Sequence, residues 1–169
     1  TPACPRGGQT SPAGSLVAWG LRPSPTPADT SSCIQSTLPA TMRDHAGAVI
    51  FGGPMSANDP EDFVKAEIDW IGTCLKEDAA FLGICLGAQM LAKHMGARVY
   101  THGEGRAEVG YYPLAITENG HSHAAAAGFT WPGTVYQWHR DGFDCPNGAE
   151  CLATGGDFPV QAIRAGRKA

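Results

Sequence analysis

The sequence predicts a three-layer α/β fold, an open mixed sheet with helices on both faces, and three observations support it. Two short apolar runs, at 46–51 and from residue 80 onward, fit strands that are buried on both faces of a sheet. Each run is followed by a segment with helical periodicity. The second half of the chain is richer in strand-forming residues, which favours a mixed sheet. Because such sheets bind ligands outside the carboxyl ends of their strands, we expect the functional site there.

Composition fits one globular domain and narrows the classes of function. The 169 residues are 43% hydrophobic and 17% charged, which allows a sizeable core. A net charge of −4 offers no basic surface for nucleic acid or an anionic membrane. No apolar run reaches the roughly 18 residues of a membrane helix, and no signal peptide is recognisable.

The cysteines are scattered and include no C-x-x-C pair, which argues against a zinc ribbon or a redox motif. We therefore expect free thiols in a reducing cytoplasm, and neither a metal nor another cofactor. The six are Cys4, Cys33, Cys74, Cys85, Cys145 and Cys151.

Residues 1–36 are rich in Pro, Gly, Ser and Thr, and two interpretations stay open for them. The apolar run 15–21 is compatible with a strand, whereas the prolines at 23, 25 and 27 forbid regular structure after it. The segment is either a divergent strand–helix unit or largely irregular.

The strand predicted at 46–51 ends in a sharp Gly52-Gly53-Pro54 loop. Backbone N–H groups of such a loop can face a ligand, although a plain turn is its commoner role. Asp59 and Pro60 then predict a helix start, as a cap and a first helical residue. Apolar residues at helical spacing continue to residue 75.

The strand that starts at residue 80 runs into Gly83-Ile84-Cys85-Leu86-Gly87, and a helix pattern follows to Met95. This G-x-C-x-G arrangement is a cysteine version of the strand–turn–helix nucleophile elbow. Glycines two residues before and after leave room for a strained turn. The positive end of the helix would favour the thiolate of Cys85, which is the nucleophilic form. A buried structural cysteine between two packing glycines is the alternative.

The second half is predicted as strands separated by turns and loops. Strands are expected at 98–100, over the extended segment 108–116, at 134–139, at 150–154 and at 160–165. Residues 117–128 are expected to be a loop with at most a turn of helix at the four alanines 124–127, and residues 140–142 a turn. Pro113 confines its segment to a sheet edge or a bulge. No repeat or domain linker is visible, so 1–169 is treated as one domain.

Several of these stretches resemble one protein family. FLGICLGAQMLAKHMGA around Cys85 is similar to the nucleophile region of class I glutamine amidotransferases, and FGGPMSAND at 51–59 resembles their oxyanion loop. EVGYYPL and QWHRDGF extend the likeness, which is greatest to stand-alone, GMP-synthase-like members. The resemblance runs from about Leu38 to Lys168 and implies a flavodoxin-like sheet.

The chemistry expected is hydrolysis of glutamine to glutamate and ammonia through a thioester on Cys85. The N–H of Leu86, next after the nucleophile, and that of Gly53 would form the oxyanion hole. Gln89 lies one helical turn beyond Cys85 and can face the same pocket. The resemblance implies that Gln89 contacts substrate. It implies further that the stretch containing Trp138, His139 and Asp141 holds the ends of glutamine.

The family's base and its orienting carboxylate are missing from the sequence. The resemblance implies a triad His in a form like FHPE, after the strand at 160–165, and assigns His139 to substrate binding. No His follows His139 and no Glu follows Glu150. Three explanations are open: the end of the protein is missing from this sequence, the gene is truncated, or the protein is a degenerate member that binds without hydrolysing. Truncation is favoured over gradual decay. Activity of the chain as given is therefore expected to be impaired.

Three functions remain open. The leading one is a glutaminase whose ammonia passes to a synthetase on a separate chain, since no ATP-pyrophosphatase region is present. A γ-glutamyl peptidase can use the same elbow. A non-catalytic binding or regulatory module can use the same pocket.

Overall fold

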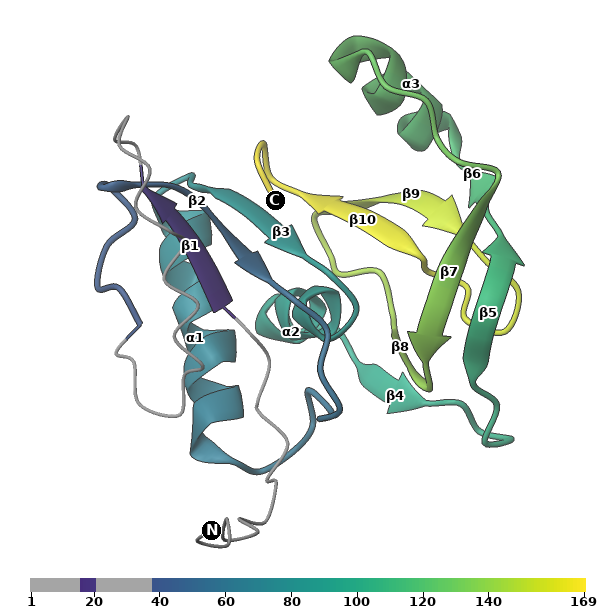
Figure 1. The fold of residues 1–169 in the computed structure, drawn as a ribbon, viewed down its shortest axis with the longest axis horizontal. Helices are drawn as coiled ribbons and strands as arrows, with labels where there is room; N and C mark the ends of the chain where they lie inside the picture. The colour runs from purple at the N-terminus through teal and green to yellow at the C-terminus, as the bar shows by residue number, and fades with distance from the viewer. Residues whose placement is uncertain (1–15, 21–37) are drawn as a thin grey trace, which may run out of the picture.

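A computed structural model describes residues 16–20 and 38–169 (Figure 1). The first part of the fold is a sheet in the order β1-β2-β3, made of β1 (Leu16–Gly20), β2 (His45–Ile50) and β3 (Ala80–Gly83). β2 and β3 are parallel, with Gly47 opposite Ala80, whereas β1 runs antiparallel to β2. The strands predicted at 46–51 and from residue 80 are confirmed, and the sheet is mixed as expected.

Two helices complete this part. α1 (Asp62–Lys76) and α2 (Leu86–His94) pack against each other and against β3. Alternation along β3 buries Phe81, which is 6% exposed, and turns Leu82, which is 55% exposed, to the opposite face. The core therefore forms between the sheet and the helix pair.

The predicted start of α1 is about two residues early. The helix begins after Glu61, which makes no side-chain cap. Asp59 instead accepts a hydrogen bond from the backbone N–H of Ser56 at 2.8 Å and closes the preceding loop.

The second part is a set of small antiparallel sheets. β4 (Val99–Thr101) pairs with β8 (Asp141–Phe143), and β5 (Glu108–Pro113) pairs with β7 (Thr134–His139). A third sheet has the order β10-β9-β6, from β10 (Ala162–Ala165), β9 (Ala149–Thr154) and β6 (Ala115–Ile116). Figure 1 shows α2 between this part and the part that carries α1. The mixed α/β class is confirmed.

Two predictions for the second half are wrong. Residues 140–142 are mostly strand β8 and not a turn, because they pair with β4. Residues 118–127 form a ten-residue helix, α3 (Glu118–Ala127), where a loop was expected. Thr117 caps it by accepting from the N–H of Gly120 at 3.0 Å, and Gly128 ends it in the left-handed region at φ 71°.

Candidate active site

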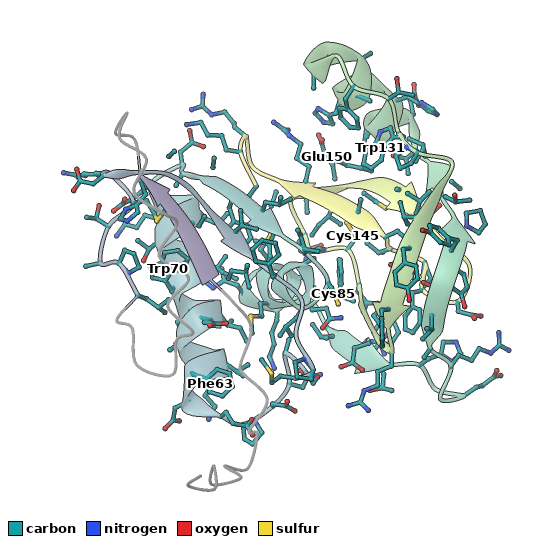
Figure 2. All side chains as sticks on the ribbon, in the orientation of Figure 1. Phe63, Trp70, Cys85, Trp131, Cys145 and Glu150 are labelled. Carbon is teal, nitrogen blue, oxygen red and sulfur yellow. The ribbon has the colours of Figure 1, made fainter. Side chains whose placement is uncertain are left out.

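Cys85 occupies the strained turn between β3 and α2. Its backbone has φ 54° and ψ −107°, a combination that residues with a side chain rarely adopt. The turn is tied to the neighbouring strand by a 2.9 Å hydrogen bond from Ile84 N–H to the carbonyl of Ile50. The elbow predicted from the G-x-C-x-G pattern is thus present, with Cys85 at the amino end of the helix (Figure 2).

Both glycines of the pattern are required by close backbone contact. A Cβ on Gly83 would lie 2.6 Å from the carbonyl of Gly87, and a Cβ on Gly87 would overlap the carbonyl of Ile50. Any side chain at either position would push α2 away from the sheet and move Cys85 with it.

Cys85 borders two cavities. The smaller has a volume of about 260 Å³, and the larger, of about 600 Å³, opens beside it. The residues that line the smaller cavity are Gly53, Pro54, Met55, Cys85, Leu86, Gln89, Ala107, Val109, Trp138, His139, Arg140 and Asp141. Gly52, Ile84, Tyr136, Phe143, Val160 and Gln161 are among those that line the larger cavity.

All seven site residues predicted from the sequence line the smaller cavity. Loop 52–59 brings Gly53, α2 brings Leu86 and Gln89 with Cys85, and the β7–β8 stretch brings the other three. Their chemical roles stay predictions. Their convergence from segments more than 80 residues apart makes this cavity the candidate site.

The pKa of the Cys85 thiol is raised above its ordinary value of 9.0, which corrects the expected thiolate. Desolvation by the surrounding cavity wall is the largest cause, although the residue as a whole is exposed, and the negative charge of Asp141 raises the pKa further. A hydrogen bond from the N–H of Leu86 lowers it. The helix end therefore does act on the sulfur, but desolvation outweighs it.

Asp141 ties three elements together. Its carboxylate accepts hydrogen bonds from the hydroxyl groups of Ser56, at 2.8 Å, and Thr101, at 2.7 Å. Its carbonyl accepts from Nε2 of Gln89 at 3.0 Å. Asp141 is 7% exposed and Gln89 is 5% exposed. Loop 52–59, β4 and α2 are thereby held around one buried residue, so Asp141 and Gln89 support the wall of the cavity.

His139 is held by hydrogen bonds on both ring nitrogens. Nδ1 lies 3.0 Å from the carbonyl of Asp141, and Nε2 lies 3.0 Å from the carboxylate of Glu108. Glu108 is 1% exposed and also accepts from Nε2 of Gln161 at 3.0 Å. Of the six histidines in the sequence, His139 alone lines the cavities at Cys85. The only histidine at the site therefore has no free nitrogen to act as a base.

Two residues at the site belong to stretches that the sequence analysis identified, but were not predicted individually as site residues. Gly52, and not only Gly53, adjoins the nucleophile, because a Cβ on Gly52 would lie 3.2 Å from the Cβ of Cys85. Arg140 lines the smaller cavity, is exposed, and forms no ion pair with any residue that the structure describes. The position of Arg140 inside the stretch QWHRDGF is the feature of the sequence that indicates a place at the site.

Trp138 lies at the mouth of the site with its side chain 74% exposed. Its carbonyl accepts a long hydrogen bond from the Cys85 thiol at 3.9 Å. The indole stacks edge to face on Tyr136, with ring centroids 6.4 Å apart, and Tyr136 stacks on Tyr111. An aromatic face of the β5–β7 ribbon thus continues from the cavity.

Other kinds of site find little support in the described residues. No group of three or more His, Cys, Asp or Glu residues in 16–20 and 38–169 is arranged to hold a metal ion. In the same residues, no helix combines the length and hydrophobicity needed to cross a bilayer.

Comparison with known proteins identifies the family of this chain. The sequence model of the family described as glutamine amidotransferase class-I matches residues 15–169. A putative glutamine amidotransferase-like protein of Salmonella typhimurium is 32% identical over 134 residues, which are 76% of this chain and 55% of that protein. A GMP synthase (glutamine-hydrolyzing) of Thermomicrobium roseum is 31% identical over 118 residues, which are 69% of this chain and 20% of that protein.

Solved structures of glutamine amidotransferases share the fold of this chain. A glutamine amidotransferase from Methylobacillus flagellatus superimposes with a TM-score of 0.67 at 29% identity. The match covers 76% of this chain and 51% of that one. The chain therefore spans about half the length of the Salmonella relative and of the Methylobacillus structure.

Proposed function

The chain belongs to the class-I glutamine amidotransferase family, and from this we propose that Cys85 accepts the γ-glutamyl group of glutamine. The observation that carries the proposal is the elbow itself. Cys85 sits on a strained turn, at φ 54°, and lines the cavity, and the nearby N–H of Leu86 lowers the pKa of its thiol. Strain of this kind persists where the surrounding structure enforces it and is frequent at active sites.

The proposed reaction forms a thioester. The sulfur of Cys85 attacks the γ-carbonyl carbon of glutamine, and the oxyanion that forms is stabilised by the N–H groups of Leu86 and Gly53. The C–N bond then breaks, and the nitrogen leaves as ammonia after it gains a proton. Water hydrolyses the thioester to glutamate and regenerates the thiol.

Proton transfer is the step for which the described residues offer no free catalytic group. The leaving nitrogen needs a proton and the attacking water must lose one, and a histidine normally serves both steps. His139 is engaged on both ring nitrogens. We therefore expect the described residues to bind glutamine and form the thioester slowly, with little turnover. General acid–base catalysis typically contributes about 100- to 10,000-fold.

Arg140 and the backbone around it suit the amino-acid end of the substrate. An arginine can bind a carboxylate with two parallel hydrogen bonds, and Arg140 faces the cavity without an ion-pair partner among the described residues. The Asp141 carboxylate is already engaged by Ser56 and Thr101. We propose that Arg140 binds the α-carboxylate and that Asp141 positions loop 52–59.

Ammonia released at Cys85 would be used by a synthetase outside the described residues. The Thermomicrobium GMP synthase is much longer than the region it shares with this chain, which is 20% of its length. A synthetase on a partner chain is the corresponding proposal here.

A γ-glutamyl peptidase is the second candidate, and the larger cavity favours it. About 600 Å³ beside Cys85, lined by Tyr136, Phe143 and Val160, has room for a leaving group larger than ammonia. The pKa of Cys85 and the engaged His139 favour a third, non-catalytic binding module.

One experiment separates these candidates. The protein is incubated with glutamine or a γ-glutamyl dipeptide, and ammonia release and the intact mass are measured, with Cys85→Ala as the control. A γ-glutamyl adduct on Cys85 with release of ammonia supports the glutaminase. An adduct formed only from the dipeptide supports the peptidase. Binding by calorimetry without any adduct, in the wild type as in Cys85→Ala, leaves the binding module.

A further inference from the structure

Loop 52–59 brings Gly53 to the cavity that Cys85 lines, and Lys93 of α2 binds two residues near the far end of the loop. Lys93 Nζ lies 2.7 Å from the carbonyl of Ala57 and 2.7 Å from the side-chain oxygen of Asn58. Asn58 in turn donates from Nδ2 to the carbonyl of Val99 at 2.9 Å. Ala57 is fully buried, and Lys93 is half-buried.

The ammonium group of Lys93 binds oxygens of the loop and not a carboxylate. Among the described residues it forms no ion pair. Both of its partners are neutral oxygens, and an ammonium group bonds such oxygens more strongly than a neutral donor does. A lysine that served solubility would extend into solvent. This one turns its ammonium group onto the main chain of a buried loop residue.

The two ends of α2 therefore act on the same site. Cys85 lies at the amino end of the helix, and Lys93 lies in its last turn. Because an α-helix is rigid over this length, the distance between sulfur and loop is set through it. Ser56 supplies a second anchor through its hydroxyl bond to Asp141 at 2.8 Å. Gly53 lies on the side of these anchors that faces Cys85.

We propose that Lys93 is a positioning residue: by holding Ala57 and Asn58, it sets the place of the Gly53 N–H relative to the Cys85 sulfur. The inference rests on the proposed function, because the Gly53 N–H matters to rate only if Cys85 is acylated. It adds a residue of α2 that touches neither substrate nor nucleophile.

The test uses an acyl donor that needs no proton for its leaving group. With the γ-(4-nitrophenyl) ester of L-glutamate, the sulfur attacks the ester carbon, the C–O bond breaks, and 4-nitrophenolate leaves with the electron pair. The thiol proton goes to buffer, and a burst of colour reports one acylation per Cys85. Wild type, Lys93→Met, Lys93→Arg and Lys65→Met are compared. Lys65 is an exposed lysine of α1 and serves as the matched control.

Lys93→Met is expected to lower the acylation rate at saturating ester about 10- to 100-fold. Complete loss of an oxyanion donor typically costs roughly 100- to 1,000-fold. The effect should be smaller here, because the variant displaces the loop that carries the Gly53 N–H but does not remove that N–H. The half-saturating ester concentration and alkylation of Cys85 by iodoacetamide, which needs no oxyanion hole, should stay near wild type. Lys93→Arg should recover most of the rate. Wild-type acylation in Lys93→Met would overturn the inference. So would a parallel loss of ester and iodoacetamide reactivity, which indicates general damage.

Hydrogen exchange keeps the two proposals separable. In Lys93→Met the amides of residues 53–59 should exchange faster, whereas Lys65→Met should leave them unchanged. If the wild type gives no burst, the proposed function fails. The role of Lys93 in holding Ala57 and Asn58 is then judged by hydrogen exchange alone. Unchanged exchange in Lys93→Met would then overturn it.

Discussion

Nε2 of His139 lies 3.0 Å from the carboxylate of Glu108, a residue that is 1% exposed. Nδ1 of the same ring faces a carbonyl, which can only accept, so this nitrogen carries a hydrogen. The pair therefore behaves as a buried structural contact. A histidine so held is a support of the cavity wall and not a mobile base.

His139→Gln should therefore damage stability more than acylation. Loss of His139 leaves the buried Glu108 carboxylate with one hydrogen-bond partner fewer, which typically costs about 1–3 kcal/mol. The double variant His139→Gln/Glu108→Gln should recover much of this, as urea unfolding of both variants and the wild type would measure. The rate of the 4-nitrophenyl ester burst should change less than about threefold in the double variant. A folded double variant without any burst would make His139 the base.

The thiol of Cys85 should react more slowly near neutral pH than a helix-end thiolate would. Its raised pKa means that the thiolate fraction, and with it the rate of alkylation by iodoacetamide, still increases above pH 9.0. Asp141→Asn removes a negative charge that raises this pKa, so the midpoint of the rate–pH curve should move to lower pH. Asp144→Asn, at an exposed ion pair with Arg98, is the control. A wild-type midpoint near pH 7 would contradict this reading.

Labelling should also rank the cysteines. Cys74 is fully buried, and burial raises its pKa to about 11, so it should resist alkylation in the native protein. Cys145 and Cys151 are accessible, with pKa values that burial also raises. Peptide mapping after brief labelling should find Cys85 ahead of both, because among these cysteines only Cys85 lies at the amino end of a helix. Faster labelling of Cys151 would count against the elbow as the reactive site.

The elbow was predictable because its signal is local. Gly83 and Gly87 sit within two residues of Cys85, and the close contacts that require them involve the same strand and helix. The predicted strands at 46–51 and 134–139 were likewise short runs whose composition suits a sheet. The helical spacing from Cys85 predicted that Gln89 can face the same pocket, whereas the roles of Gly53 and Asp141 at one site followed from the resemblance to a known family.

What could not be predicted depends on contacts between distant segments. The helix at 118–127 lacks an apolar stripe, and it is held by the Thr117 cap and by Gly120, which sits against the carbonyl of Leu152. The Glu108–His139 pair joins two strands by their register. The pKa of Cys85 depends on burial and on Asp141, which lies 56 residues away in the sequence. The Thr117 cap is local, but the other contacts join segments far apart in the sequence and cannot be recognised in a short window.

Arg140→Gln should weaken substrate binding and leave the chemistry of Cys85 intact. A hydrogen bond to a charged group is typically worth about 1.5–3 kcal/mol, and exposure of Arg140 places the effect near the lower end. The half-saturating concentration of the glutamate ester should rise about 10-fold. The 4-nitrophenyl ester of butyrate, which has no α-carboxylate, provides the control and should react equally with both proteins. An equal loss with both esters would place Arg140 in a structural role.

Glu67 should make the stability of the protein depend on pH in an unusual direction. It lies on α1 at 9% exposure, one of its carboxylate oxygens has no hydrogen-bond partner among the described residues, and burial raises its pKa from 4.5 to about 7. Between pH 4.5 and about 7 the folded state keeps a proton that the unfolded state releases, so this group's contribution to stability is lost as pH rises through that window. At 1.36 kcal/mol per pKa unit, the loss is on the order of 3 kcal/mol.

Glu67→Gln removes the ionisable group and should abolish that loss. Relative to wild type, the variant should have a similar free energy of unfolding at pH 4 and a higher one at pH 8. Urea unfolding at both pH values measures the difference, because other titrating groups contribute equally to the two proteins. Asp69→Asn changes an exposed acid two residues away on the same helix and should show no such trend. A Glu67→Gln variant that is less stable than wild type at pH 8 would mean that the Glu67 carboxylate is bonded in the folded protein, and its pKa would then not be raised.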